Sequence, residues 1–85
     1  MTDQTRIEIL DKLVADVGDE LSAPVTPTTA LISSGLLRSV QTAWLLKYVE
    51  REFGVRVRLD RLALRNFETL ESVTTLILEL RASAG

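Results

Sequence analysis

Ser39 is the side chain of this sequence whose type and position could do chemistry. It follows the segment 35–38, which begins with glycine and ends with Arg38, and it opens a run with helical spacing. A helix N-terminus presents free N–H groups and positive partial charge, which favour an attached or bound phosphate. A phosphate esterified to Ser39, whether as phosphoserine or as part of a larger group, would lie there, and Arg38 would pair with it. Serine is also a preferred helix cap, and position alone favours that simpler role.

The residue types that the chain lacks exclude several kinds of catalytic and metal-binding site. The chain has no histidine and no cysteine, which excludes nucleophile–base pairs built on either residue and zinc sites with the usual ligands. The remaining carboxylates and serines show no catalytic spacing, so we expect a protein that is not an enzyme and holds no metal. Lack of cysteine fits a reducing compartment, and the acidic, amphipathic start MTDQTRIEIL does not resemble a signal peptide. We therefore expect a cytoplasmic protein.

The charges are sorted along the chain although the net charge is only −2. Residues 1–20 carry −4, residues 21–37 carry none, residues 38–65 carry +4 and residues 66–85 carry −2. The cations of the middle segment are Arg38, Lys47, Arg51, Arg56, Arg58, Arg61 and Arg65. A basic segment on an acidic frame indicates a contact surface for something negative, although most charge runs are only solvated faces.

Eighty-five residues, 46% of them hydrophobic, are enough for one core and one domain, residues 1–85. Apolar spacing predicts a first helix over 5–17, capped by a Thr5–Glu8 box and stopped at Gly18. Its expected buried stripe is Ile7, Leu10, Val14 and Val17, with Leu13 beside it. The long connection that follows, 18–35, is pinned to the core by Leu31 and Ile32 in this prediction.

The second predicted helix covers 39–53 and is closed by Gly54. Its expected buried side is Thr42, Leu45, Leu46, Val49 and Phe53, and its opposite side is Val40, Ala43, Trp44, Lys47 and Arg51. Residues 55–59 alternate and predict a short extended stretch, followed by a single turn over 61–64 capped by Asp60. A last helix over 70–81 has Thr69 as its N-cap and Leu70, Val73, Leu76, Ile77 and Leu80 inward. The pattern predicts an all-α fold, a four-helix bundle with three longer helices, one short helix and a long loop between the first two.

The order GLLRSVQTAWLLKYVEREFGVRV, then LDRLALRNFETLESV, resembles the acyl and peptidyl carrier proteins over nearly the whole chain. Gly35 matches the family's glycine, Val40 replaces its leucine, and Ser39 matches the serine that carries 4′-phosphopantetheine. Phe53-Gly54-Val55, Asn66-Phe67 and Thr69-Leu70 resemble the later junctions of that fold. The resemblance implies a four-helix bundle, a covalent 4′-phosphopantetheine on Ser39, and a thiol on that arm which the chain itself lacks. Arg38 departs from the family pattern, which has aspartate there, and so reverses a charge beside the attachment site.

The resemblance also implies the partners. They are a phosphopantetheinyl transferase, an acyl-loading ligase or acyltransferase, and ketosynthase, condensation or tailoring enzymes of a polyketide, lipopeptide or fatty-acid-type pathway. The expected form is a free-standing monomer, and the cargo is acyl or, alternatively, aminoacyl in a nonribosomal pathway. The docking surface would be the outward side of the second helix, Val40, Ala43, Trp44, Lys47 and Arg51. Trp44 is then either an exposed contact residue or partly buried, and the cations favour an acidic partner.

Two other functions remain open. An unmodified carrier-like interaction domain, with Ser39 as a helix cap only, is kept open by Arg38. A nucleic-acid-binding domain is disfavoured because the net charge is negative and the arginines flank an extended stretch instead of lining one helix. We therefore expect no nucleic acid as a partner. We also expect no membrane, because no stretch approaches the ~20 apolar residues of a membrane helix.

Overall fold

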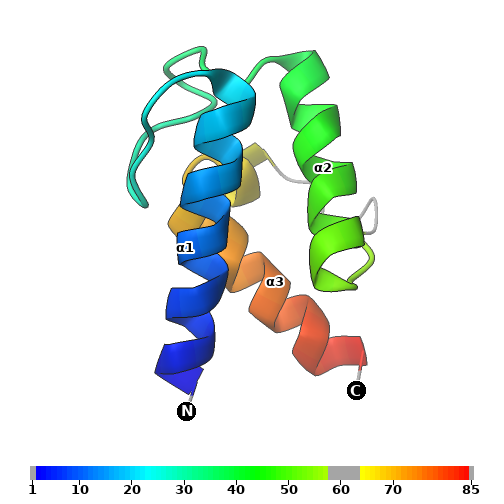
Figure 1. Cartoon of the computed structure of the whole chain (residues 1–85). Helices are drawn as coiled ribbons and strands as arrows, with labels where there is room; N and C mark the ends of the chain where they lie inside the picture. Colours follow the sequence, from blue (N-terminus) through cyan, green and yellow to red (C-terminus); the bar gives the residue numbers. More distant parts are fainter. Residues whose placement is uncertain (1, 58–63, 85) are drawn as a thin grey trace.

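The computed structural model describes residues 2–57 and 64–84, and this part of the chain is helical, without strands. Its elements are α1 (Thr2–Leu21), α2 (Ser39–Phe53), the 3₁₀ turn η2 (Leu64–Phe67) and α3 (Leu70–Ala84). The end of α1 and the start of α2 lie at one end of the molecule, and both chain termini lie at the other (Figure 1). The predicted turn over 61–64 and its cap Asp60 fall outside the described residues, apart from Leu64, which begins η2.

The prediction that α1 stops at Gly18 is wrong, because the helix continues to Leu21. The left-handed residue that ends it is Ser22, with φ 53°. Around it the Ala23 N–H donates to the Gly18 carbonyl at 3.2 Å and the Ser22 N–H donates to the Asp19 carbonyl at 3.3 Å. This pair of bonds is a Schellman motif, which closes a helix around its left-handed residue. Glycine is the usual residue at this left-handed position, and because Ser22 occupies it here, the end of the helix could not be recognised from the sequence.

The buried side of α1 also differs from the prediction. Ile9, Leu13 and Val17 are buried, with Leu10 and Val14 partly so, whereas Ile7 is 51% exposed. The apolar residues of this helix span a wide arc, and the bundle covers only part of it, so Ile7 falls on the solvent edge. On the same helix Arg6 donates to Thr75 Oγ1 at 3.0 Å and to the Glu71 carbonyl at 3.3 Å, joining α1 to α3.

The core of α3 agrees with the prediction. All five residues expected to point inward, Leu70, Val73, Leu76, Ile77 and Leu80, are buried. Thr69 caps the helix as expected, since its Oγ1 accepts the Ser72 N–H at 3.1 Å.

The buried side of α2 agrees with the prediction in part. Leu45, Val49 and Phe53 are buried as predicted. Thr42 and Leu46, also predicted to be buried, are only half-buried, whereas Tyr48, which was not predicted, belongs to the core. A tyrosine can be buried when its hydroxyl finds a partner, and Tyr48 donates to Asp16 of α1.

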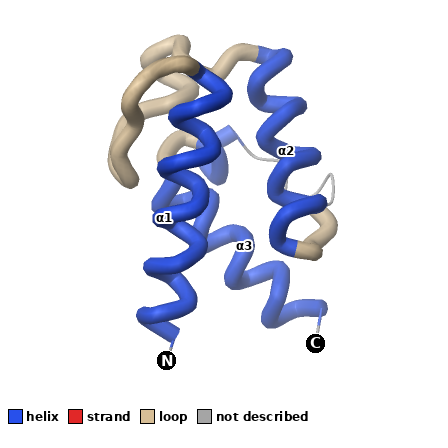
Figure 2. The backbone as a smooth tube through the Cα atoms, in the orientation of Figure 1, coloured by secondary structure: helices blue, strands red, loops and turns tan. Residues whose placement is uncertain are grey.

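The connection from Ser22 to Arg38 contains no helix (Figure 2). Leu31, completely buried, anchors it in the core together with Val25 and Leu37, and Ile32 packs against the same cluster. The expected anchoring by Leu31 and Ile32 is therefore confirmed. No helix in the described residues is long and apolar enough to cross a membrane.

Glu68, between η2 and α3, holds the connection in place from the other side. Its carboxylate accepts the N–H groups of Ile32 and Ser33, each at 3.0 Å, and the Ser33 hydroxyl. Its carbonyl accepts the Leu31 N–H at 2.7 Å. The bonds from Ser33 and then from Ile32 hold the pKa of the Glu68 carboxyl below its ordinary value. Glu68 thus fixes the segment leading to Ser39 to the start of α3, where the Glu71 N–H also donates to the Pro27 carbonyl at 3.1 Å.

Candidate functional site

Ser39 is the first residue of α2, and its side chain is exposed. The N-cap position belongs to Arg38, whose backbone is extended at φ −96° and ψ −175° and whose carbonyl accepts the Thr42 N–H at 2.7 Å. Ser39 therefore stands one residue inside the capping position. Within the described part of the chain the structure records no hydrogen bond of its hydroxyl, which leaves the oxygen accessible from solvent.

The residues before Ser39 explain why it lies on the surface at a fixed place. Gly35 turns the chain with φ 84°, and its N–H donates to the Ile32 carbonyl at 3.1 Å. Leu37 then enters the core at 3% exposure, and its N–H donates to the Leu31 carbonyl at 2.8 Å. Because Leu37 is anchored, Ser39 can shift little relative to the bundle. A left-handed glycine followed by a buried leucine thus sets the position of the serine.

Arg38 gives the helix start an unusual cap. A guanidinium has no acceptor, so it cannot receive the free N–H groups of the first turn. Gln41 provides only the reciprocal half of a capping box, its Oε1 accepting the Arg38 N–H at 3.1 Å. The first-turn N–H groups of α2 therefore remain available beside the exposed Ser39 and the exposed Arg38. This set of donors suits an attached phosphate.

Replacing Arg38 with aspartate is expected to raise the free energy of unfolding by about 1 kcal/mol, because a carboxylate can accept the first-turn N–H groups and complements the helix dipole. Urea unfolding followed by far-ultraviolet circular dichroism measures the change. Arg38→Ala is the control, since it removes the cation without adding an acceptor. A gain no larger for Arg38→Asp than for Arg38→Ala would show that the first turn is already satisfied.

The outward side of α2 continues from Ser39 away from the core. Val40, Ala43, Lys47 and Arg51 are all exposed, Val40 at 78%; we call these four residues the outer face. Trp44, predicted to belong to it, is partly buried and lies at its edge. Its ring stacks on Tyr48, with centroids 5.0 Å apart and planes 22° apart. Of the two alternatives for Trp44, the structure favours the partly buried one, through a contact with Tyr48.

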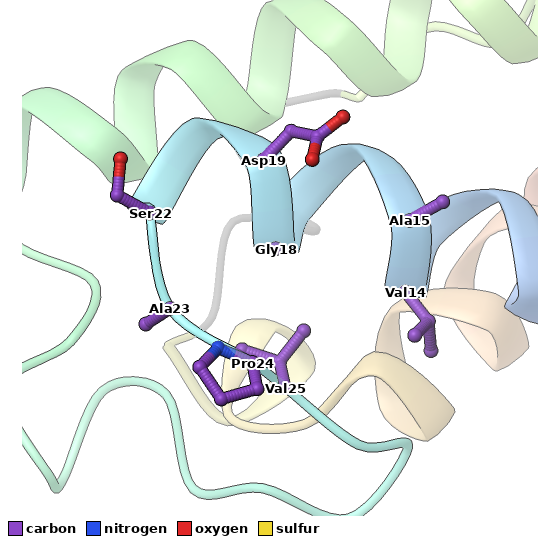
Figure 3. Close-up of a pocket in the computed structure, with 8 residues that line it drawn as sticks. All are labelled: Val14, Ala15, Gly18, Asp19, Ser22, Ala23, Pro24 and Val25. Carbon is purple, nitrogen blue, oxygen red and sulfur yellow. The ribbon is translucent and has the colours of Figure 1, made fainter.

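An open hollow of about 670 Å³ lies beside the end of α1 (Figure 3). It is lined by Val14, Ala15, Gly18, Asp19, Ser22, Ala23, Pro24 and Val25. The lining is mostly small and apolar, and in the close-up Asp19 and Ser22 point away from Pro24 and Val25. The lining does not include Leu36, Leu37 or Ser39, so the hollow is separate from the site around the serine.

Among the described residues no group of histidine, cysteine, aspartate or glutamate could hold a metal ion. No protein-family model matches the chain, and the search of curated proteins finds no match either.

Proposed function

We propose that this chain is an acyl carrier protein whose Ser39 carries 4′-phosphopantetheine. The observation that carries this proposal is the exposed hydroxyl of Ser39 at the first position of α2, which has no hydrogen bond to any of the residues that the structure describes. A phosphate ester there would be met by first-turn N–H groups and by Arg38. The finer fold, a four-helix bundle with a long connection between its first two helices, belongs to the same proposal.

The prosthetic group would supply a thiol on a flexible arm, on which an acyl intermediate is held as a thioester. The chain has no cysteine of its own, so its contribution is to position and present that arm. Attachment forms a bond between the Ser39 oxygen and the phosphorus of the pantetheine phosphate. It breaks the pyrophosphate linkage of coenzyme A and releases adenosine 3′,5′-bisphosphate, and the hydroxyl proton passes to the transferase.

The proposal requires partners in sequence. A phosphopantetheinyl transferase modifies Ser39, a ligase or acyltransferase loads the arm, and ketosynthase, condensation or tailoring enzymes use the cargo. An aminoacyl cargo is the alternative within the same chemistry. The chain would act as a monomer in the cytoplasm, and it would not itself be an enzyme.

A second candidate is a carrier-like interaction domain that is never modified. Arg38 at the N-cap favours it, because a transferase that reads an acidic residue before the serine would meet a cation instead. In that case the outer face, and not Ser39, would be the functional surface.

Intact-protein mass spectrometry decides between the two candidates. The chain is incubated with coenzyme A, magnesium and a broad-specificity phosphopantetheinyl transferase, and in parallel with the transferase of the cell that makes the chain. We expect a gain of one phosphopantetheine on the native chain and none on Ser39→Ala. Ser34→Ala is the matched control, because Ser34 is another exposed serine before α2 and its loss should leave the gain unchanged.

The result that contradicts carrier function is equally clear. If neither transferase adds the group while a known carrier substrate is fully modified in the same tubes, the unmodified interaction domain is the better explanation. A gain that persists in Ser39→Ala would place the modification on another serine.

A further inference from the structure

The connection between α1 and α2 ends in a closed turn that leads directly to Ser39. The Leu37 N–H donates to the Leu31 carbonyl at 2.8 Å, which joins the two ends of the segment 31–37; we call this segment the 31–37 turn. Its last residue stands two positions before Ser39 in the chain. The conformation of the turn therefore decides where the serine hydroxyl lies relative to the bundle.

The core holds only the two ends of this turn. The side chains of Leu31 and Leu37 are buried, whereas Ser33, Ser34 and Gly35 between them are exposed. Packing therefore does not fix the backbone in the middle of the turn. An exposed segment that includes a glycine can adopt many backbone conformations unless its polar groups are bound.

The Glu68 carboxylate binds the middle of the turn. Its Oε1 accepts two successive backbone N–H groups, those of Ile32 and Ser33, each at 3.0 Å, and its Oε2 accepts the Ser33 hydroxyl. Successive N–H groups that converge on one oxygen are a common way for a turn to bind an anion. Within the described residues, every hydrogen bond of this carboxylate goes to the 31–37 turn.

Glu68 itself stands at a rigid place in the fold. Phe67 before it and Leu70 after it are buried, and Thr69 caps α3 through its hydroxyl. The junction of η2 and α3 thus holds the carboxylate still. Because that carboxylate binds the turn, the position of the segment that enters α2 is set from α3.

We infer that Glu68 is a positioning residue for the modification of Ser39. It holds the 31–37 turn in the conformation that presents the serine hydroxyl, without a hydrogen bond to that hydroxyl. When the carboxylate is removed, only a fraction of the molecules has the turn in place at any time, and a transferase that binds this conformation binds the chain more weakly by that fraction. The inference deepens the proposed function and rests on it for the reaction at Ser39.

Steady-state kinetics of the whole chain, with coenzyme A, magnesium and the transferase that modifies the native chain, test the inference. Glu68→Ala should raise the KM for the chain about three- to tenfold and leave kcat within about twofold, because the bound chain has its turn in place. Ile77→Val is the control, since it removes a methylene from the buried side of α3 without touching the turn. Its KM should stay within about twofold of the native value, with both variants folded by circular dichroism.

Glu68→Gln distinguishes positioning from a direct charge contact between Glu68 and the transferase. The amide keeps an oxygen that can accept both N–H groups, and its NH₂ group can donate to the Ser33 hydroxyl, but the charge is lost. Positioning predicts that Glu68→Gln recovers most of the loss seen in Glu68→Ala, whereas a charge contact predicts equal losses.

Amide hydrogen exchange without any transferase gives a readout that does not depend on modification. The N–H groups of Ile32 and Ser33 should exchange at least about tenfold faster in Glu68→Ala than in the native chain. An unchanged KM in Glu68→Ala, an equal rise in Ile77→Val, equal losses in Glu68→Ala and Glu68→Gln, or unchanged exchange would each overturn the inference and leave the carrier proposal standing. If no transferase modifies the native chain, the carrier proposal fails and the role of Glu68 in that reaction fails with it.

Discussion

Leu31→Ala is expected to lower the free energy of unfolding by about 3 kcal/mol, as much as truncating a leucine inside a helical core. Leu31 belongs to the connection between α1 and α2, yet its side chain is completely buried. Its N–H donates to the Glu68 carbonyl and its carbonyl accepts the Leu37 N–H. Shortening the side chain would leave a cavity beneath a segment that has no helix of its own to support it. The connection would therefore loosen at the point that fixes Leu37 and, through it, Ser39.

Urea unfolding measures the loss, and Leu36→Ala is the matched control. Leu36 is a leucine of the same connection but is only partly buried, so its truncation should cost about 1 kcal/mol or less. Amide hydrogen exchange adds a local readout, since the N–H groups of Leu31, Ile32 and Ser33 should exchange faster in Leu31→Ala than in Leu36→Ala. Equal costs for the two variants would show that the connection lies on the core without contributing to it.

The sequence predicted best where strong local signals mark an element. Gly54 closes α2 in the left-handed conformation, with φ 67° and its N–H bonded to the Glu50 carbonyl at 3.1 Å. Thr69 caps α3 through its own hydroxyl. At these two ends the apolar periodicity and the cap residue agree, which is why both boundaries could be predicted; on α1 the same residue types, Thr5 and Gly18, lie inside a helix that runs from Thr2 to Leu21.

Prediction failed where one pattern allowed two outcomes. The apolar arc of α1 is wider than the surface that the bundle covers, and periodicity alone does not say that Ile9 is buried while Ile7 is exposed. Gly18 looked like a stop, but a glycine inside a helix costs only about 1 kcal/mol, and Ser22 took the left-handed position.

The contacts that shape the candidate site depend on distant pairs. The Glu68 carboxylate accepts the N–H groups of Ile32 and Ser33, which lie more than thirty residues earlier in the chain, and no local sequence pattern predicts a contact over that separation. Tyr48 and Asp16 meet across two helices in the same way. The sequence placed Ser39 at the start of α2 correctly, but it did not reveal that Arg38 takes the N-cap and that the serine hydroxyl has no hydrogen bond within residues 2–57 and 64–84.

Tyr48→Phe is expected to lower the free energy of unfolding by about 1.5 kcal/mol near neutral pH. The Tyr48 side chain is buried at 4% exposure between Trp44 and Phe53, and its hydroxyl donates to the Asp16 carboxylate, which also lies 3.1 Å from Lys12. A hydrogen bond to a charged group contributes about 1.5–3 kcal/mol. We take the lower end because the Asp16 side chain is 35% exposed and water can replace the lost donor.

The pH dependence identifies this bond. The hydrogen bond from Tyr48, and then the one from Lys12, lower the pKa of the Asp16 carboxyl below its ordinary value of 3.8. Burial, and then Asp16, raise the pKa of the Tyr48 hydroxyl above its ordinary value of 10.0. The Asp16 carboxylate therefore stabilises the folded state fully above the pKa that it has in the unfolded chain, and this stabilisation is lost as the pH falls through its lower pKa in the folded state. The Tyr48 hydroxyl stabilises the folded state fully below pH 10.0, and this stabilisation is lost as the pH rises through its higher pKa in the folded state.

The stability difference between the native chain and Tyr48→Phe should therefore be constant from about pH 5 to pH 9 and shrink below about pH 4. Urea unfolding at a series of pH values measures it, with the fluorescence of Trp44, the single tryptophan of the chain, as the probe. Other carboxylates affect both proteins alike and cancel in the difference. Asp16→Ala, which removes the acceptor of the Tyr48 hydroxyl, completes a double-mutant cycle with Tyr48→Phe. Additive losses, or a difference that does not change with pH, would show that the Tyr48 hydroxyl contributes independently of the Asp16 carboxylate, and no loss in Tyr48→Phe would show that the ring alone stabilises the fold and that packing holds α1 and α2 together at this point.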